Sequence, residues 1–245
     1  MALVSVIIPY FRKKKYFFKT INSVINQSYK KIEIILIYDD KNKKDLTYVK
    51  KIIKKDKRIK LIVNKTNYGA AISRNIGIKF SKGKYISFLD VDDVWLRNKL
   101  KIQFNYMKKN NLNFTHTSYK IIDENSDYIS VRKARNFMSV NDLIKSCDIG
   151  LSTVMIKKEL LNQKSFPKLK TKEDYVLWLK LLSKNVKIYG IKDNLVLWRK
   201  VKNSLSSSFF QKMIDGFRVY NTYMKYNFLK SLFFLFFLSL NYLKK

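Results

Sequence analysis

Residues that bind metals or cross-link small folds are scarce in this chain. Its 245 residues include one cysteine, Cys147, and one histidine, His116. This composition excludes an internal disulfide framework, a cysteine-rich zinc site and a multi-histidine metal centre. With only two prolines and six glycines, the chain also lacks low-complexity linkers and collagen-like repeats. Any chemistry must therefore rely on carboxylates and backbone groups, with or without a hard metal that prefers oxygen ligands.

Acidic residues are also few, which leaves a large positive charge. The 18 Asp and Glu residues against 51 Lys and Arg residues give a net charge of +33. Such a charge is typical of proteins that bind nucleic acid or an anionic membrane. Lysine greatly outnumbers arginine, however, and is spread over every segment, so we interpret most lysine runs as solvated faces. Attraction to anionic lipid headgroups or to a phosphorylated substrate is the alternative.

The first hundred residues alternate short apolar runs with segments of helical spacing. The apolar start of the chain has no basic segment before it, so we expect a buried strand there and not a signal peptide. Strands are predicted at residues 4–8, 32–37, 59–63 and 85–89, with helices between them. This pattern predicts an α/β fold with a mostly parallel central sheet and helices on both faces.

The second half of the chain is less regular. We predict strands at residues 114–118, 152–156, 186–189 and 195–201, and an amphipathic helix at residues 175–182. His116 lies on the first of these strands, and we interpret it as a core or acceptor-side residue and not as a catalytic one.

Three carboxylates, Asp90, Asp92 and Asp93, follow the buried strand at residues 85–89. Clustered like charges repel, so such a group needs a cation or hydrogen-bond donors to compensate it. Oxygen ligands at this spacing suit Mg²⁺ or Mn²⁺ bridging to a diphosphate. The alternative is a polar turn in which Asp92 or Asp93 caps the following helix.

Other polar residues follow strands at the same expected edge of the sheet. Asp39 and Asp40 follow the second strand, where a carboxylate can accept hydrogen bonds from a nucleobase or a ribose. A helix begins near Gly69, and Arg74 lies about one turn inside it, where its planar charge suits a diphosphate. A surface ion pair is the alternative for Arg74.

Five blocks in this order resemble the family 2 glycosyltransferases, bacterial enzymes of the GT-A fold. The blocks lie at residues 4–10, 23–29, 32–40, 69–77 and 83–93. The resemblance implies a nucleotide-sugar donor, most simply a UDP-sugar, and an Asp-x-Asp motif that contacts the ribose and binds Mg²⁺ or Mn²⁺. Position by position, it assigns the donor site to Pro9, Tyr10, Asp39 with Asp40 as a substitute, Arg74 and Asp90, and the metal to Asp90 and Asp92. Lys41 and Asn42 depart from the family's usual Gly-Ser.

The resemblance returns at residues 171–179, where the family has a Glu-Asp pair before an aromatic-rich helix. It assigns the general base to Asp174, and an acceptor contact or a helix cap to Glu173. The position is physically reasonable, because Thr171 is the expected N-cap and the first turn of a helix favours an ionised carboxylate. The alternative is an acidic first turn that only stabilises its own helix.

A final block, at residues 198–206, departs from the family at its histidine, which is Val201 here. Arg199 or Lys202 is the expected replacement in neutralising phosphate charge.

The chain ends in an apolar, aromatic segment at residues 228–243, flanked by lysines. Sixteen helical residues span about 24 Å, which is short of a hydrocarbon core of roughly 30 Å. We expect a helix that lies on the membrane surface, with packing on the domain or on a second subunit as the alternative.

These observations predict an inverting, metal-dependent glycosyltransferase in cell-surface polysaccharide synthesis. We expect a GT-A domain at residues 1–205, with a donor half at 1–95 and an acceptor half at 96–205, and a helical tail at 206–245. The expected acceptor is a glycan or a lipid-linked saccharide, the expected location is the cytoplasm at the inner face of the cell membrane, and no nucleic-acid partner is expected. The alternatives are a basic nucleic-acid-binding protein and a non-catalytic sugar-nucleotide binder.

Overall fold

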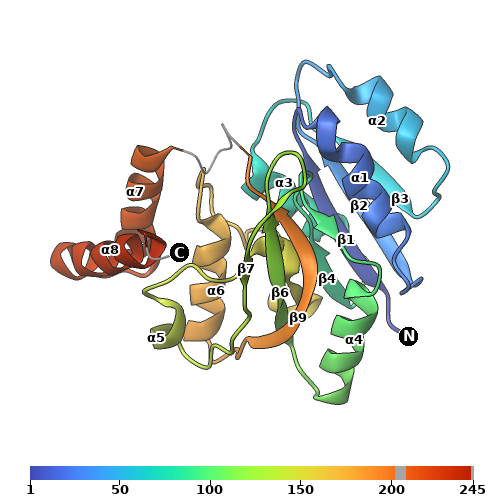
Figure 1. Cartoon of the computed structure of the whole chain (residues 1–245). Helices are drawn as coiled ribbons and strands as arrows, with labels where there is room; N and C mark the ends of the chain where they lie inside the picture. The colour runs from blue at the N-terminus through green and yellow to red at the C-terminus, as the bar shows by residue number, and fades with distance from the viewer. Residues whose placement is uncertain (202–207, 244–245) are drawn as a thin grey trace.

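One mixed sheet organises the fold (Figure 1). The structure is a computed structural model that describes residues 1–201 and 208–243. Within these residues the sheet has nine strands in the order β3-β2-β1-β4-β8-β6-β9-β5, and β7 pairs with β6. The strands of the first half, β1 (Val4–Tyr10), β2 (Ile32–Tyr38), β3 (Ile59–Val63) and β4 (Tyr85–Phe88), are all parallel, as predicted.

Helices cover both faces of this parallel half. Alternate residues of a strand point to opposite faces, so Ile7 and Ile8 of β1 enter two different apolar cores. The core around Ile7 includes residues of α3 (Ala70–Phe80) and α6 (Glu173–Ser183). The core around Ile8 includes residues of α1 (Lys14–Ile25), α2 (Leu46–Ile53) and α4 (Lys99–Lys109). This arrangement brings the carboxyl ends of β1, β2 and β4 to one edge.

The second half of the sheet is antiparallel in most of its pairs. It contains β5 (Val94–Trp95), β6 (Phe114–Ile122), β7 (Tyr128–Arg132), β8 (Met155–Lys157) and β9 (Tyr189–Arg199), of which only β6 and β9 pair in parallel. Short helical turns, α5 (Val140–Leu143), η1 (Leu151–Thr153) and η2 (Lys158–Leu160), connect these strands.

Three strand predictions in this half were wrong in their bounds. The strands predicted at 186–189 and 195–201 are one strand, β9. The polar residues inside it obscured the alternation, and a register shift opposite Thr117 and Ser118 absorbs them. The strand predicted at 152–156 begins with the turn η1, and only its end is extended. His116 is a buried core residue, as predicted, and burial lowers its pKa to about 4.

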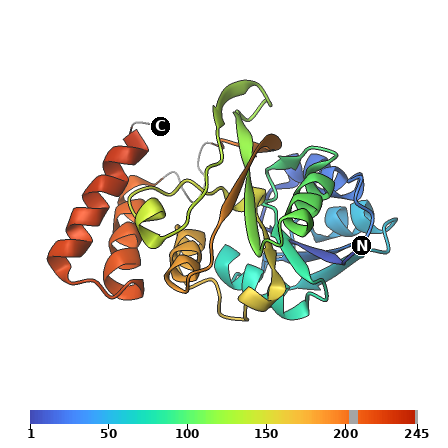
Figure 2. The same ribbon diagram turned by 90° about the horizontal axis from the view of Figure 1, so that it is seen from below.

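The chain ends in a helical pair that lies beside α6. It consists of α7 (Phe209–Arg218), a π-helical turn η4 (Val219–Tyr223) and α8 (Phe228–Leu243). Figures 1 and 2 show α7 and α8 side by side, far from β3. One side of α8 packs on the domain, which was the alternative expectation, because Leu235 and Leu238 are buried in the core that contains α6. Among the described residues no helix is both long and apolar enough to span a bilayer.

Candidate active site

The three carboxylates after β4 have three different environments. Asp90 is the most accessible, with 35% of its side chain exposed, and Asp92 is less so, at 19%. Asp93 is fully buried: it accepts hydrogen bonds from Ser152 Oγ at 2.6 Å and from the backbone N–H of Arg199 at 2.8 Å. Burial and the neighbouring aspartates raise the pKa of Asp93 well above its usual value. Asp93 therefore supports the loop, and Asp90 and Asp92 are left for ligands.

Arg74 joins the two acidic motifs. It lies inside α3, buried, and its guanidinium donates to Asp90 Oδ1 at 2.7 Å and to Glu173 Oε1. The guanidinium also lies over the ring of Phe166, with its carbon 5.5 Å from the ring centroid. Burial alone would lower the pKa of Arg74, but the charges of Asp90 and Glu173 outweigh it and raise the pKa. We therefore interpret Arg74 as the cation that neutralises both motifs, and its expected diphosphate contact stays a prediction.

Asp174 lies in the first turn of α6, next to Glu173. Its Oδ1 accepts a hydrogen bond from the backbone N–H of Tyr175 at 2.7 Å. Burial and the charge of Glu173 raise its pKa from 3.8 to about 7, although Arg74 acts in the opposite direction. A carboxylate with such a pKa is suited to accept a proton near neutral pH.

The cap of α6 differs from the prediction. Thr171 is not the N-cap: Lys172 occupies that position with a left-handed backbone, at φ 63°. The hydroxyl of Thr171 donates instead to Asp215, which lies on α7 and is more than forty residues away in the sequence. Sequence spacing alone could not reveal this partner.

Lys13 neutralises Asp92. Its Nζ lies 3.1 Å from Asp92 Oδ2, so this lysine does not belong to a solvated face. Burial and the charge of Asp90 raise the pKa of Asp92, and Lys13 partly offsets them. Thr20 supports the same loop, because its hydroxyl lies 2.8 Å from the carbonyl oxygens of Val91 and Asp93. The sequence around Lys13 and Thr20 contains no motif that predicts these contacts.

Arg199 is buried and holds the loop after β4. Its Nε donates to the carbonyl oxygen of Asp92 at 3.0 Å, and its Nη1 donates to that of Asp123 at 2.8 Å. Its guanidinium also lies 4.9 Å from the ring centroid of Tyr16. These contacts give Arg199 a supporting role, and its expected contact with phosphate stays a prediction. Lys202, the other candidate for that contact, lies outside the described residues.

Tyr10 belongs to the core of the parallel half of the sheet. It is fully buried, stacks on Tyr38 and donates its hydroxyl to Asp45 Oδ2 at 2.7 Å. Burial and this hydrogen bond raise its pKa. Its ring therefore positions the loop after β2, and Pro9, which is half-buried, is the more accessible of the two.

The two carboxylates after β2 have partners within the protein. Asp39 accepts hydrogen bonds from Asn64 Nδ2 at 2.7 Å and from the backbone N–H groups of Tyr68 and Gly69 at 2.9 and 2.7 Å. It thus holds the turn that begins α3. The neighbouring Asp40 pairs with Arg12 through two hydrogen bonds of 3.2 Å, which lower its pKa. Both carboxylates lie at the predicted edge of the sheet.

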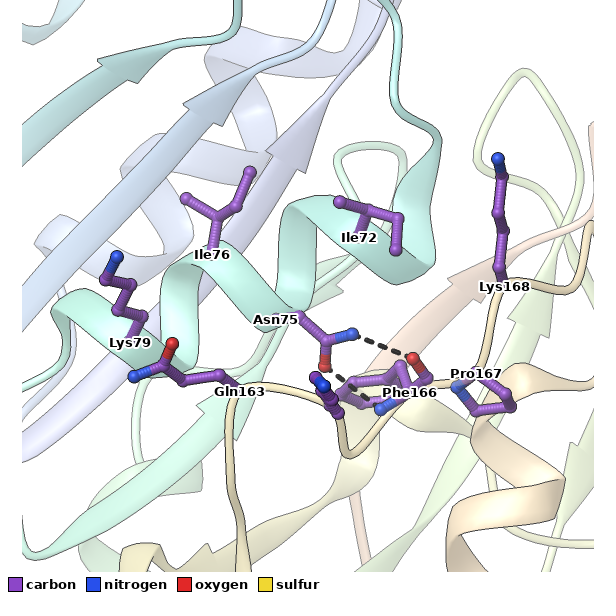
Figure 3. A pocket seen from close by; sticks show the side chains of 9 residues that line it. Ile72, Asn75, Ile76, Lys79, Gln163, Phe166, Pro167 and Lys168 are labelled. Atoms are coloured by element: carbon purple, nitrogen blue, oxygen red, sulfur yellow. Dashed lines mark hydrogen bonds between the residues drawn. The ribbon is translucent and has the colours of Figure 1, made fainter.

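Asn75 fastens the segment before α6 to α3. Figure 3 shows its two hydrogen bonds to the backbone of Phe166: Nδ2 donates to the carbonyl at 2.7 Å, and Oδ1 accepts from the N–H at 3.0 Å. The adjacent cavity of about 340 Å³ is lined by α3 and this segment, including Lys79 and Lys168. None of the predicted site residues lines this cavity.

The donor set at Asp90 and Asp92 fits a magnesium-like ion that a substrate helps to bind. Magnesium is usually held by one or two carboxylates together with substrate phosphates and water. Among the described residues, no group of three or more His, Cys, Asp or Glu side chains is placed to hold a metal. Asp90 and Asp92 therefore provide enough ligands for such an ion only together with a phosphate-bearing substrate.

Comparison with known proteins identifies the family of this chain. A family model described as "Glycosyl transferase family 2" matches residues 5–168, which is more than half of the chain. The chain belongs to glycosyl transferase family 2. It is a glycosyltransferase, as the resemblance in the sequence predicts, and the pair Glu173–Asp174 follows the matched segment.

Two curated relatives match most of the chain. WfgD of Escherichia coli, a UDP-Glc:alpha-D-GlcNAc-diphosphoundecaprenol beta-1,3-glucosyltransferase, is 38% identical over 213 residues, covering 86% of this chain and 82% of that protein. TuaG of Bacillus subtilis, a putative teichuronic acid biosynthesis glycosyltransferase, is 31% identical over 230 residues, covering 94% and 91%.

A solved structure shows the same fold. S. aureus TarS 1-349 in complex with UDP-GlcNAc superposes with a TM-score of 0.73 at 20% identity. The match covers 91% of this chain and 65% of the TarS chain, so the glycosyltransferase spans just under two thirds of that structure. The likeness confirms the predicted GT-A fold.

Proposed function

We propose that the protein is an inverting glycosyltransferase that moves a sugar from a nucleotide-diphosphate sugar to a hydroxyl of a glycan or a lipid-linked saccharide. The observation that carries this proposal is the cluster in which Arg74 joins Asp90 and Glu173 beside Asp174. It brings the acidic motif after β4 and the acidic start of α6 into one electrostatic unit, at the sheet edge where α/β folds bind ligands.

Asp174 is the proposed general base. It accepts the proton of the acceptor hydroxyl while that oxygen attacks the anomeric carbon from the face opposite the diphosphate. The bond between the anomeric carbon and the diphosphate oxygen breaks with its electron pair, the nucleoside diphosphate leaves, and the configuration inverts. A pKa of about 7 matches this task, because about half of the molecules hold the ionised base at neutral pH. Arg74 partly balances the charge of the base and holds the neighbouring Glu173, whose charge keeps the pKa of Asp174 high.

Asp90 and Asp92 are the proposed ligands of Mg²⁺ or Mn²⁺. When bound, such an ion offsets the negative charge that develops on the departing diphosphate. Lys13 pairs with Asp92 through one flexible side chain, which can turn away when a divalent ion is present. Asp90 also contacts the ribose in this proposal, which its greater exposure permits.

A UDP-sugar is the proposed donor. WfgD is named for UDP-Glc and the TarS structure holds UDP-GlcNAc, which supports a uridine nucleotide. We place the nucleoside at the ends of β1 and β2, near Pro9 and Asp39. The donor half at residues 1–95 and the acceptor half at 96–205 are part of this proposal, and the boundary at 205 lies outside the described residues.

The acceptor is proposed to be lipid-linked, in cell-surface polysaccharide synthesis at the inner face of the cell membrane. WfgD is named for a diphosphoundecaprenol acceptor and TuaG for teichuronic acid biosynthesis. The outer faces of α7 and α8 support peripheral contact with such a membrane. They expose large apolar side chains, namely Phe209, Phe210, Ile214, Phe228, Leu229, Leu232, Phe233 and Phe236. The net charge of +33 favours an anionic lipid surface.

A thermal-shift panel of nucleotide sugars, each with and without Mn²⁺, tests the donor proposal. We expect a UDP-sugar to raise Tm most, and Mn²⁺ to enlarge the shift. The matched variant is Asp92→Asn, which should lose the Mn²⁺-dependent part and keep the fold. Salt-dependent retention on DNA that neither UDP nor Mn²⁺ changes, together with no shift from any nucleotide sugar, would contradict the proposal.

A further inference from the structure

A buried carboxylate outside the predicted site contacts the segment that carries the general base. Asp215 lies on α7 and is fully buried. Its Oδ2 accepts two hydrogen bonds from Thr171, one from the backbone N–H and one from Oγ1, each of 3.0 Å. Arg218 Nη1 lies 3.7 Å from its other oxygen. A buried carboxyl group is costly unless it has partners: Oδ2 has its two hydrogen bonds to Thr171, whereas the buried Oδ1 has no hydrogen-bond partner among the described residues.

Thr171 lies three residues before Asp174, at the point where the chain turns into α6. The next residue, Lys172, occupies the N-cap with φ 63°, and it makes no side-chain hydrogen bond to the helix. The first N–H groups of a helix have no partner within the helix. The start of α6 is therefore held from outside, by Asp215 on Thr171 and by Arg74 on Glu173.

The same C-terminal segment also anchors the residue after Asp174. Tyr175 Oη lies 3.3 Å from Tyr220 Oη, and both hydroxyls donate to the carbonyl oxygen of Ile144 at 2.7 Å. Asp215 and Tyr220 thus hold the chain on either side of Asp174. Figure 2 shows α7 beside α6, consistent with these contacts.

The part of α7 that carries Asp215 is buried and closely packed. A Cβ on Gly216 would lie 2.8 Å from Leu235 Cδ1 of α8 and 3.6 Å from Lys172 Cε. The residue next to Asp215 therefore lies between α8 and the N-cap of α6. A carboxylate held at such a closely packed position can fix the position of a catalytic group.

We propose that Asp215 is a positioning residue for the general base, acting through Thr171. This inference rests on the proposed role of Asp174 in sugar transfer. The helix α7, which lies in the expected tail at residues 206–245, then belongs to the catalytic unit.

The test compares Asp215→Asn and Thr171→Val with the full-length enzyme, using the UDP-sugar that gives the largest thermal shift. A displaced base costs turnover and not donor binding, so we expect kcat to fall about 10-fold to 100-fold with the donor Kd within about twofold. Thr171→Ser, which keeps the hydroxyl, should restore kcat. The acid limb of the pH profile should also move to lower pH, because a loosened Asp174 is better solvated.

Asp56→Asn is the matched control. Asp56 also accepts a backbone N–H, that of Arg58 at 2.9 Å, but it lies before β3. We expect this control to lower Tm and leave kcat unchanged. If Asp215→Asn does not fold, Thr171→Val carries the test alone, because it removes only one of the two hydrogen bonds.

The outcomes separate this inference from the proposed function. Normal turnover in Asp174→Asn would remove the base itself, and with it the proposed mechanism. If Asp174→Asn is inactive while Asp215→Asn and Thr171→Val keep normal kcat and a normal pH profile, the positioning role is overturned and the proposed function stands.

Discussion

The pH dependence of turnover is the most direct test of the proposed base. Burial and Glu173 raise the pKa of Asp174 to about 7, and the base must be ionised to accept a proton. At pH 5, about two units lower, only about 1% of the molecules hold the ionised form, so kcat/KM should be about 100-fold below its plateau. With an ordinary aspartate pKa of 3.8, the rate would change little between pH 5 and pH 8.

The assay follows release of UDP at constant ionic strength, with kcat/KM for the donor as the readout, since this quantity reports ionisations of the free enzyme. Log kcat/KM should rise by about one per pH unit up to about pH 7 and then level off. Glu173→Gln should move this limb to lower pH, because it removes the charge that disfavours ionisation of Asp174. A rate that stays flat down to pH 5 in the wild type would refute the assignment.

The raised pKa of Asp174 should also affect the pH dependence of stability, in the direction opposite to its effect on turnover. The folded-state pKa of Asp174 lies above the unfolded value, so the folded state holds its proton more tightly. Stability is then lost as the pH rises from about 4 to about 7. Asp174→Asn removes this loss, and its Tm should exceed that of the wild type at pH 8 but not at pH 4. A lower Tm at pH 8 would show that the charge is well compensated in the fold.

Three further predictions concern the metal, the core and the membrane. Asp92→Asn should abolish Mn²⁺-dependent UDP binding in titration calorimetry, and unchanged affinity would remove the metal role. Gly77→Ala should lower the free energy of unfolding by about 1–3 kcal/mol in urea, because its methyl would overlap a side chain of β1; an unchanged midpoint would show that the core adjusts. Replacing Phe210 and Leu229, 80% and 77% exposed, by serine should weaken sedimentation with anionic vesicles, whereas Tyr128→Ser, 63% exposed on β7, should not. Equal binding by all variants would contradict the membrane face.

Local sequence pattern was sufficient for the parallel half of the fold. The apolar runs that form β1, β2 and β4 are nearly continuous because these strands are buried on both faces, and the helices between the strands have clear spacing. The pattern failed at β9, where polar residues lie inside the strand and only pairing with β6 shows that it is continuous. The helix α7 lies in the predicted helical tail, but the sequence did not indicate that its Asp215 contacts the start of α6.

What the sequence determined by itself about the site is which carboxylates come after which strands and helices. Asp90 and Asp92 were found in this way, because strand ends depend on nearby residues, whereas Asp174 was assigned by the resemblance to the family. Their assigned roles stay predictions. The resemblance to the family added the nature of the reaction.

The tertiary structure decided which charges neutralise each other. Arg74 meets Glu173 across 99 residues, and Thr171 meets Asp215 across 44. Such pairs depend on how α3, α6 and α7 pack, and packing depends on the shape of the whole core, which no local spacing encodes. The same packing buries Arg199 and Tyr10 and gives them hydrogen-bond partners within the protein. Burial and such partners are properties of the folded chain.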